Sequence, residues 1–246
     1  MSHVSPFARK LSAFVRLSDR EAAVLSDLHR RRRRFSPGHD IIRQGEKSKA
    51  AYVLATGWAS SYVLLPNGLR QIVGIQIPGD FLGLNAVLLR TSDHSVEPIT
   101  PIFEASAVQV SDLLEAVAEP SLLAKAALCV ASHDQTVLVE HMISIGRRDS
   151  AQRTAHFLLE LWVRLQRVGL GDTSGYPCPL TQYHLADALG LSPVHINRVL
   201  RILREDGLVT FQNGQVSFGD FDRLVDFADF DLARLNQQVP ELQKVA

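Results

Sequence analysis

The chain has 246 residues, of which 46% are hydrophobic, so it can bury the core of one large or two modest domains. Basic and acidic residues number 26 each, so the net charge excludes a uniformly basic protein, and a nucleic-acid site would need its basic residues concentrated in one place. Cys129 and Cys178 are the only cysteines. Their wide spacing disfavours a disulfide framework, a zinc ribbon and a four-cysteine iron–sulfur cluster, and it fits a reducing cytoplasm.

No apolar run reaches the roughly 18 residues that a membrane-spanning helix needs, and no signal-length apolar segment opens the chain. We therefore expect a cytoplasmic protein without membrane contact. Residues 18–28 predict a short helix, because Ser18 and Glu21 have the spacing of a capping box. The five arginines Arg30 to Arg34 predict a solvated edge strand, with a patch for DNA or another anionic partner as the alternative.

Residues 35–110 have the pattern of many short strands. The stretches 52–54, 60–65 and 71–77 are rich in β-branched and aromatic residues, and turn signals separate them at intervals of about ten residues. This spacing predicts an antiparallel sandwich or jelly-roll barrel. The turn signals are Pro37-Gly38, Gln44-Gly45, Thr56-Gly57, Pro66-Asn67-Gly68 and Pro78-Gly79-Asp80.

Residues 111–148 predict one long helix with an apolar stripe, either a core helix or a dimer seam, although His133 and Glu140 interrupt the stripe. A second helix is predicted over 151–168, followed by a glycine- and proline-rich loop over 169–179. Cys178 in that loop is a candidate exposed thiol, although no neighbour acidifies it. The stripe of the long helix consists of Leu122, Ala126, Cys129, Val130, Val137 and Ile143.

Residues 182–201 predict two helices joined by a tight turn. Gly190 falls where the turn needs a positive φ, and small Ala186 falls where the helices cross. Thr181 can cap the first helix, and Ser192 can cap the second, with Pro193 at its first position. The apolar residues that would face the core are Leu185, Leu189, Leu191, Ile196, Val199 and Leu200.

The outer face of the second helix is polar and suited to DNA. Arg198 can donate two hydrogen bonds to guanine, and Asn197 can pair with adenine if it reaches the base. Side chains and helix dipoles at the two helix N-termini suit phosphate oxygens. The predicted DNA-contacting residues are Thr181, Gln182, Ser192, Val194, His195, Asn197, Arg198 and Arg201.

The segment 208–218 follows, with Asn213-Gly214 between two alternating strands, which predicts a β-hairpin wing. Residues 220–236 predict an amphipathic C-terminal helix. The helix pair alone would also fit a corner of a helical bundle. Caps, turn glycine, exposed arginines and wing coincide, however, and together they favour a helix-turn-helix that binds DNA.

These features resemble the cyclic-AMP receptor and fumarate–nitrate regulator (CRP/FNR) superfamily over nearly the whole chain. The resemblance rests on Gln44-Gly45-Glu46, on Tyr52-Val53-Leu54 with Gly57, and on Pro78 to Gly83, ahead of the long helix and the winged helix-turn-helix. It implies an α+β fold with an N-terminal antiparallel β-roll, a jelly roll of the cyclic-nucleotide-binding kind, for residues 1–115. A dimerisation helix (116–147) and a C-terminal winged helix-turn-helix domain (148–246) would follow.

The sequence departs from the family at the nucleotide site. Family members that bind cyclic nucleotides have Glu where this chain has Leu84, and an Arg-Ser/Thr-Ala stretch where it has His94-Ser95-Val96. Without that carboxylate and permanent cation the phosphate would be poorly paired, which argues against cyclic AMP. The residues expected to line an effector pocket are Gly83, Leu84, His94 and Ser95.

Residues 1–50 contain no cysteine, which excludes the family's N-terminal iron–sulfur cluster. Haem is disfavoured, because a lone histidine such as His39, His94, His133 or His141 is more often a surface or core residue than an axial ligand. No cofactor or metal is therefore expected, and the effector is an unknown small molecule or is absent.

The resemblance implies a homodimer that regulates transcription by reading a palindromic site in double-stranded DNA, with RNA polymerase as a further partner. The alternative is a ligand-binding or protein-interaction module with weak or vestigial DNA binding. An enzyme is not expected, because no nucleophile–base pair, metal-spaced cluster or phosphate loop is present.

Overall fold

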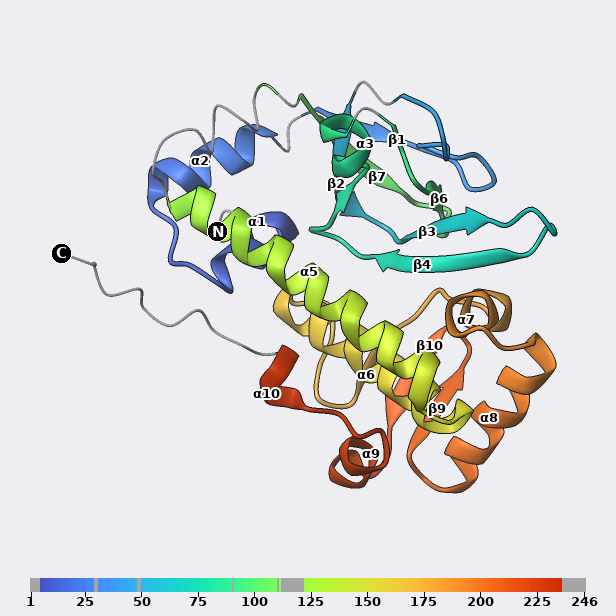
Figure 1. Cartoon of the computed structure of the whole chain (residues 1–246). Helices are drawn as coiled ribbons and strands as arrows, with labels where there is room; N and C mark the ends of the chain where they lie inside the picture. The colour runs from blue at the N-terminus through green and yellow to red at the C-terminus, as the bar shows by residue number, and fades with distance from the viewer. Residues whose placement is uncertain are drawn as a thin grey trace.

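The computed structural model describes residues 5–28, 31–47, 50–89, 91–109, 111 and 122–235. The long helix α5 (Leu122–Arg147) crosses the molecule diagonally between a β-roll on one side and a mainly helical C-terminal domain on the other (Figure 1). Helix α6 (Ser150–Arg167) runs back along α5 and begins the C-terminal domain. This arrangement confirms the predicted fold class.

Two short helices precede the β-roll, α1 (Pro6–Ser12) and α2 (Asp19–Leu28). The predicted capping box at α2 is present: the Ser18 amide donates to Glu21 Oε2 at 2.8 Å, and the Glu21 amide donates to Ser18 Oγ at 3.4 Å. Helix α1 buries Phe7 and Leu11 in a cluster that contains Val53 of the β-roll and Val130 of α5. The N-terminal segment therefore packs the β-roll against the long helix.

The β-roll consists of two antiparallel sheets with strand orders β1-β7-β2-β5 and β4-β3-β6. The three stretches predicted from β-branched residues lie in β2, β3 and β4, and a short helix, α3 (Leu84–Leu88), follows β5. Between the sheets lie Leu54, Leu82, Val96 and Phe103, all buried. The strands are β1 (Arg32–Arg34), β2 (Ala51–Thr56), β3 (Ala59–Leu64), β4 (Arg70–Gln76), β5 (Phe81–Leu82), β6 (Ser95–Pro98) and β7 (Glu104–Val108).

The arginine run forms the outer edge of the first sheet. Arg30 lies outside the described residues, while Arg32 to Arg34 form β1, which pairs with β7 in the terminal position of the sheet order. Arg34 Nε lies 2.8 Å from Glu104 Oε1, and all three side chains are exposed. The predicted edge strand is confirmed.

Helix α5 accounts for the described part of the helix predicted over 111–148, of which residues 112–121 lie outside the description. Ala126 and Val130 of the predicted stripe are buried. His133 and Glu140 are buried as well, so the interruptions of the stripe lie on the inner face of the helix.

Within the described residues, the C-terminal domain combines five helices with a three-stranded sheet of order β8-β10-β9. Its core is continuous with the β-roll, because Ile72, Ile75 and Ile77 belong to the same buried cluster as Leu158 and Leu189. The elements after α6 are β8 (Gly175–Pro177), α7 (Gln182–Leu189), α8 (Pro193–Glu205), β9 (Val209–Gln212), β10 (Gln215–Phe218), α9 (Phe221–Phe227) and α10 (Leu232–Leu235).

Two sequence predictions in this domain were wrong. The loop predicted over 169–179 contains β8, because Gly175 to Pro177 pair with β10 and the Tyr176 hydroxyl donates to the buried Leu158 carbonyl at 2.8 Å. The helix predicted over 220–236 is broken into α9 and α10, and Asn236 lies outside the described residues. Asp229 has a φ of 49° at the break, which allows Phe230 to enter the core.

In the part of the chain that the structure describes, no helix is both long and apolar enough to cross a membrane.

Cys178 is buried rather than exposed, with 1% of its surface accessible, and burial raises the pKa of its thiol to about 12. We predict that one thiol per chain reacts with Ellman's reagent at pH 8 in the native protein, and two in denaturant, because Cys129 is half-buried on α5. A Cys129→Ser variant should abolish the native reaction. Native labelling of that variant would contradict the burial of Cys178.

Candidate nucleic-acid interface

The first helix of the helix-turn-helix begins with a reciprocal capping box. The His184 amide donates to Thr181 Oγ1 at 3.3 Å, and the Thr181 amide donates to His184 Nδ1 at 3.0 Å. Burial lowers the pKa of His184, which keeps the ring neutral and leaves Nδ1 able to accept. The sequence predicted the Thr181 cap but not this role of His184, because capping boxes usually carry Glu or Gln at that position.

The turn between α7 and α8 has the predicted geometry. Gly190 ends α7 with a φ of 65°, and the Leu191 amide then donates to the Ala186 carbonyl at 3.1 Å. Ser192 caps α8 by accepting from the His195 amide at 3.2 Å, and Pro193 occupies the first helical position. Ala186 and Ile196 are buried between the helices. The local sequence therefore fixes how α8 projects from the domain.

The outer surface of the two helices forms a shallow concavity. It gathers most of the predicted contact residues, while Thr181, Ser192 and His195 lie outside its lining. Tyr183, which was not predicted, also lines it and is 70% exposed, and Val194 is 81% exposed. The lining consists of Gln182, Tyr183, Pro193, Val194, Asn197, Arg198 and Arg201.

The polar side chains in this concavity differ in how far they are engaged. Asn197 Nδ2 donates to Gln182 Oε1 at 3.3 Å, and Arg201 Nε lies 3.9 Å from Glu205 Oε1. No carboxylate of the described residues lies within ion-pair distance of Arg198, whose exposed guanidinium can donate two parallel hydrogen bonds. His195 Nε2 lies 3.1 Å from Ser150 Oγ, so this ring also ties α8 to the start of α6.

The predicted wing is the hairpin β9–β10. Asn213 and Gly214 have φ values of 53° and 71°, the pair of positive values that a tight two-residue hairpin requires. Strand β8 pairs with the far side of β10, so the wing is the edge of a three-stranded sheet. Figure 1 shows β9 and β10 between α6 and α8, with α7 and α8 at the right-hand edge of the domain.

A second candidate site lies between the β-roll and α5, in a cavity of about 960 Å³. Gly83, Leu84 and His94 line it, as predicted. Ser95 does not: it is buried, and its hydroxyl accepts from the Gln44 amide at 3.1 Å. Neighbouring residues at the start of β6 point to opposite sides, which places Ser95 away from the cavity that His94 lines. Helix α5 contributes Ala127, Val130, Ala131, Asp134, Gln135 and Leu138 to the lining.

The charges of this cavity do not fit a cyclic nucleotide. His94 Nδ1 lies 2.6 Å from Asp93 Oδ1, so the histidine already faces a carboxylate, and Asp134 adds a second one. Leu84 contributes an apolar side chain where a ribose hydroxyl would need an acceptor. Among the described residues, no three His, Cys, Asp or Glu side chains are grouped as a metal site.

Comparison with known proteins finds a family match in each half of the chain. Residues 32–119 match the cyclic nucleotide-binding domain, and residues 152–227 match the Crp-like helix-turn-helix domain. The nitrogen fixation regulation protein FixK of Bradyrhizobium diazoefficiens is 31% identical over 196 residues, which cover 77% of this chain and 78% of FixK. The chain belongs to the CRP/FNR superfamily of transcription regulators.

Further relatives agree with this assignment. The transcriptional activatory protein AadR of Rhodopseudomonas palustris is 30% identical over 179 residues, 72% of each chain. The solved structure of FixK2 from Bradyrhizobium japonicum superposes with a TM-score of 0.70 at 25% identity, over 80% of this chain and 96% of FixK2. This regulator is thus a DNA-binding transcription regulator. The two family matches do not include residues 120–151, the segment that contains α5.

We predict that Arg198→Ala lowers the affinity for an operator selected from random DNA by about 10- to 100-fold. A bidentate arginine–guanine contact contributes about 1–3 kcal/mol to the discrimination between bases. Affinity measured by fluorescence anisotropy should fall much less on unselected DNA, where phosphate contacts dominate.

Arg204→Ala is the matched control, because Arg204 is exposed on the same helix but lies outside the lining of the concavity. Equal losses for both variants would show that Arg198 contributes charge and not base recognition.

Proposed function

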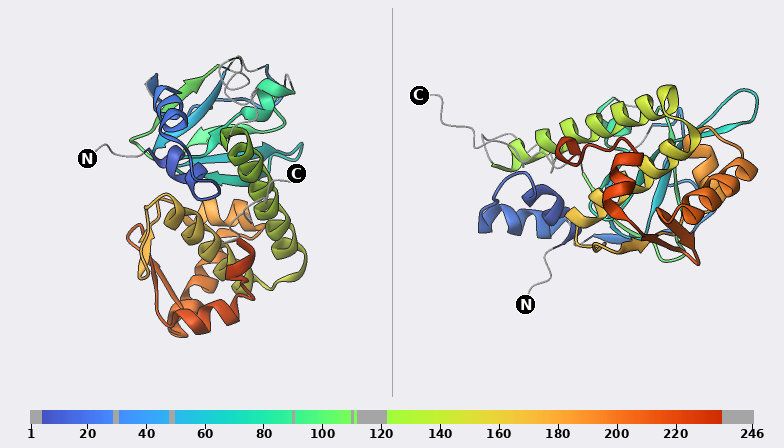
Figure 2. Two further views of the ribbon diagram at one scale, coloured as in Figure 1. Left: turned by 90° about the vertical axis from the view of Figure 1, so that its left-hand side faces the viewer. Right: turned by 90° about the horizontal axis from the view of Figure 1, so that it is seen from below.

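We propose that this regulator acts as a homodimer on a palindromic operator, with each α8 in a major groove and a small-molecule effector in the β-roll cavity. The observation that carries the proposal is an apolar stripe on the outer face of α5. Leu128 is 70% exposed and Met142 is 67% exposed, and Leu138 and Ile145 lie on the same helical face. The right-hand view in Figure 2 shows α5 along an outer edge of the molecule.

A second copy of α5 is the occupant that this stripe suits. An apolar row of this length on an exposed 26-residue helix is typical of a seam between two helices. Two-fold symmetry along α5 would give the dimer two recognition helices, and these would read half-sites one helical turn of DNA apart. The proposed boundaries, residues 1–115, 116–147 and 148–246, agree with α5 ending at Arg147 and α6 beginning at Ser150.

The DNA contacts that we propose follow from the concavity of the helix-turn-helix. Arg198 and Asn197 would contact base edges, Val194 an apolar base edge, and Arg201 and Gln182 the backbone. Thr181, Ser192 and His195 lie at the N-termini of α7 and α8, where free amides suit phosphate. Because AadR is named an activatory protein, RNA polymerase is a further proposed partner, and the DNA target implies a cytoplasmic location.

We predict that Met142→Glu converts the dimer to a monomer in sedimentation velocity, because a carboxylate in the seam would be desolvated and would face its symmetry mate. Operator affinity should fall in parallel, because one head then binds without the other.

The control is Lys125→Glu, which places the same carboxylate at an exposed position of α5 that already carries a charge, 17 positions from Met142, and it should leave the dimer intact. A monomeric wild-type protein, or a dimeric Met142→Glu variant, would contradict the proposed seam.

We predict that saturating cyclic AMP leaves the unfolding temperature unchanged, because its phosphate would lie among the carboxylates of Asp93 and Asp134. Thermal shift measured with and without the nucleotide checks this. A rise of several degrees would overturn our assignment of the cavity.

A further inference from the structure

The DNA-binding domain is joined to the β-roll by a direct ion pair at α7. Arg70 Nε of β4 lies 2.9 Å from Asp187 Oδ2, and the neighbouring Gln71 Nε2 donates to the Ala188 carbonyl at 3.2 Å. Arg70 is itself held in the β-roll, with Nη1 3.1 Å from Glu97 Oε2 and its guanidinium 5.0 Å from the Tyr62 ring. The C-terminal domain with its helix-turn-helix is called the reading head below. Its helix α7 is therefore held by an arginine whose position is fixed in the β-roll.

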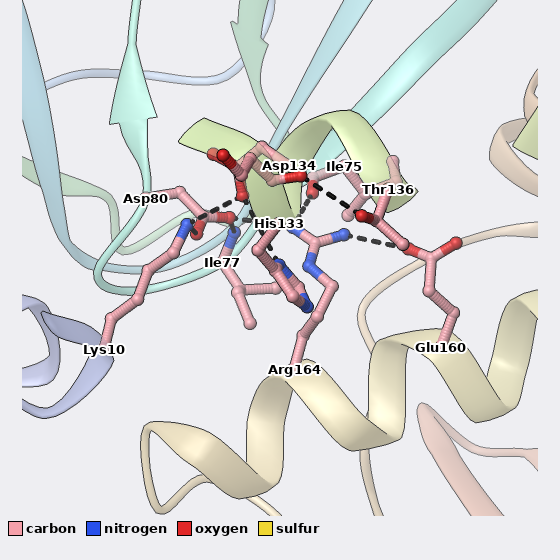
Figure 3. A network of polar contacts seen from close by, with 10 residues as sticks. Lys10, Ile75, Ile77, Asp80, His133, Asp134, Thr136, Glu160 and Arg164 are labelled. Atoms are coloured by element: carbon pink, nitrogen blue, oxygen red, sulfur yellow. Dashed lines mark hydrogen bonds and ion pairs between the residues drawn. The ribbon is translucent and has the colours of Figure 1, made fainter. Parts of the chain in front are cut away.

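A second tie lies at α6, where Arg164 reaches the β-roll (Figure 3). Its Nη2 donates to Asp80 Oδ2 at 2.8 Å and to the Ile75 carbonyl at 2.6 Å. Burial alone would lower the pKa of Arg164, but the carboxylates of Asp80 and Glu160 raise it above its usual range. The guanidinium thus remains charged in this buried position.

The junction of α5 and α6 is a third tie. Arg153 donates to three carbonyls at the end of α5, those of Ser144, Ile145 and Arg148, at 3.0 to 3.1 Å. It also donates to the Leu189 carbonyl at the end of α7, at 2.7 Å. The reading head is therefore attached at three separate points to the β-roll and to the helix that would form the dimer seam.

We propose that the Arg70–Asp187 ion pair holds each recognition helix in the orientation that lets both heads of the dimer bind one operator, which makes these two residues positioning residues for DNA recognition. The inference rests on the proposed homodimer. Asp187 lies outside the lining of the DNA-facing concavity, so the pair leaves that surface free for DNA. Without it, α7 loses one of its polar contacts with the β-roll, and a shift of α7 against β4 moves the two α8 helices away from the separation that successive major grooves require.

The test compares a full palindromic operator with a half-site. Arg70→Ala and Asp187→Ala should each lower affinity for the full operator by about tenfold, because binding of the second head loses effective concentration. The double variant should lose no more affinity than Arg70→Ala alone, because Arg70→Ala already removes the contact with Asp187 together with those to Glu97 and Tyr62. Affinity for the half-site should stay unchanged, because one head needs no partner.

Asp187→Asn is a second variant that keeps the side-chain shape, and Arg34→Ala is the matched control. Arg34 forms an ion pair of similar length with Glu104 inside the β-roll, so its loss should leave both affinities unchanged. The unfolding temperature of each variant shows whether it is folded.

The possible failures are distinct. If wild-type protein binds the full operator no better than the half-site, the homodimer proposal fails, and this inference fails with it. If wild-type protein prefers the full operator but the Asp187 variants keep that preference, only the positioning role is overturned. Equal losses on both DNAs, or tighter binding by the variants, would also overturn it.

Discussion

The carboxylate of Asp80 is the contact on which the arrangement of the molecule depends. It accepts from the Ile77 amide at 3.0 Å within its own turn, and it pairs with Lys10 at 2.7 Å and with Arg164 at 2.8 Å. One buried group therefore joins α1, the β-roll and α6. Burial alone would lower the pKa of Lys10, but Asp80 and Asp134 raise it, so the buried ammonium stays charged. A buried charge left without its partner is destabilising by about 3–5 kcal/mol, which opposes separation of these elements.

The parts of the fold that the sequence predicted are those whose signals are local. Thr181, Gly190 and Ser192 act within a few residues of themselves, so caps and turn of the helix-turn-helix were predictable and are confirmed. Strand β8 was missed because Tyr176 becomes a strand residue by pairing with Val216, forty positions later. The break before α10 was missed because it depends on Phe230 packing against His156, with ring centroids 4.8 Å apart.

In the candidate sites too, residues set by local sequence were predictable and residues set by distant contacts were not. The residues of α8 were predictable, because a helix of known phase leaves a known face exposed. Tyr183 was missed because only Thr181 and Gln182 were assigned to DNA at the start of α7, whereas the exposure of Tyr183 on the first turn of this helix is the relevant signal. The ties between domains join residues that are 117 and 84 positions apart, Arg70 with Asp187 and Asp80 with Arg164, and no sequence spacing indicates such pairs.

Strand β4 and the reading head share one apolar core, so the two domains are not separable pieces. Ile72 and Ile75 pack in the same apolar cluster as Leu158 and Leu189, so cutting the chain between the two matched domains would expose apolar surface on both pieces. The domains recognised from sequence are therefore not independent folding units. A change in the shape of the β-roll therefore reaches α7 directly, through side chains in contact, as well as along α5.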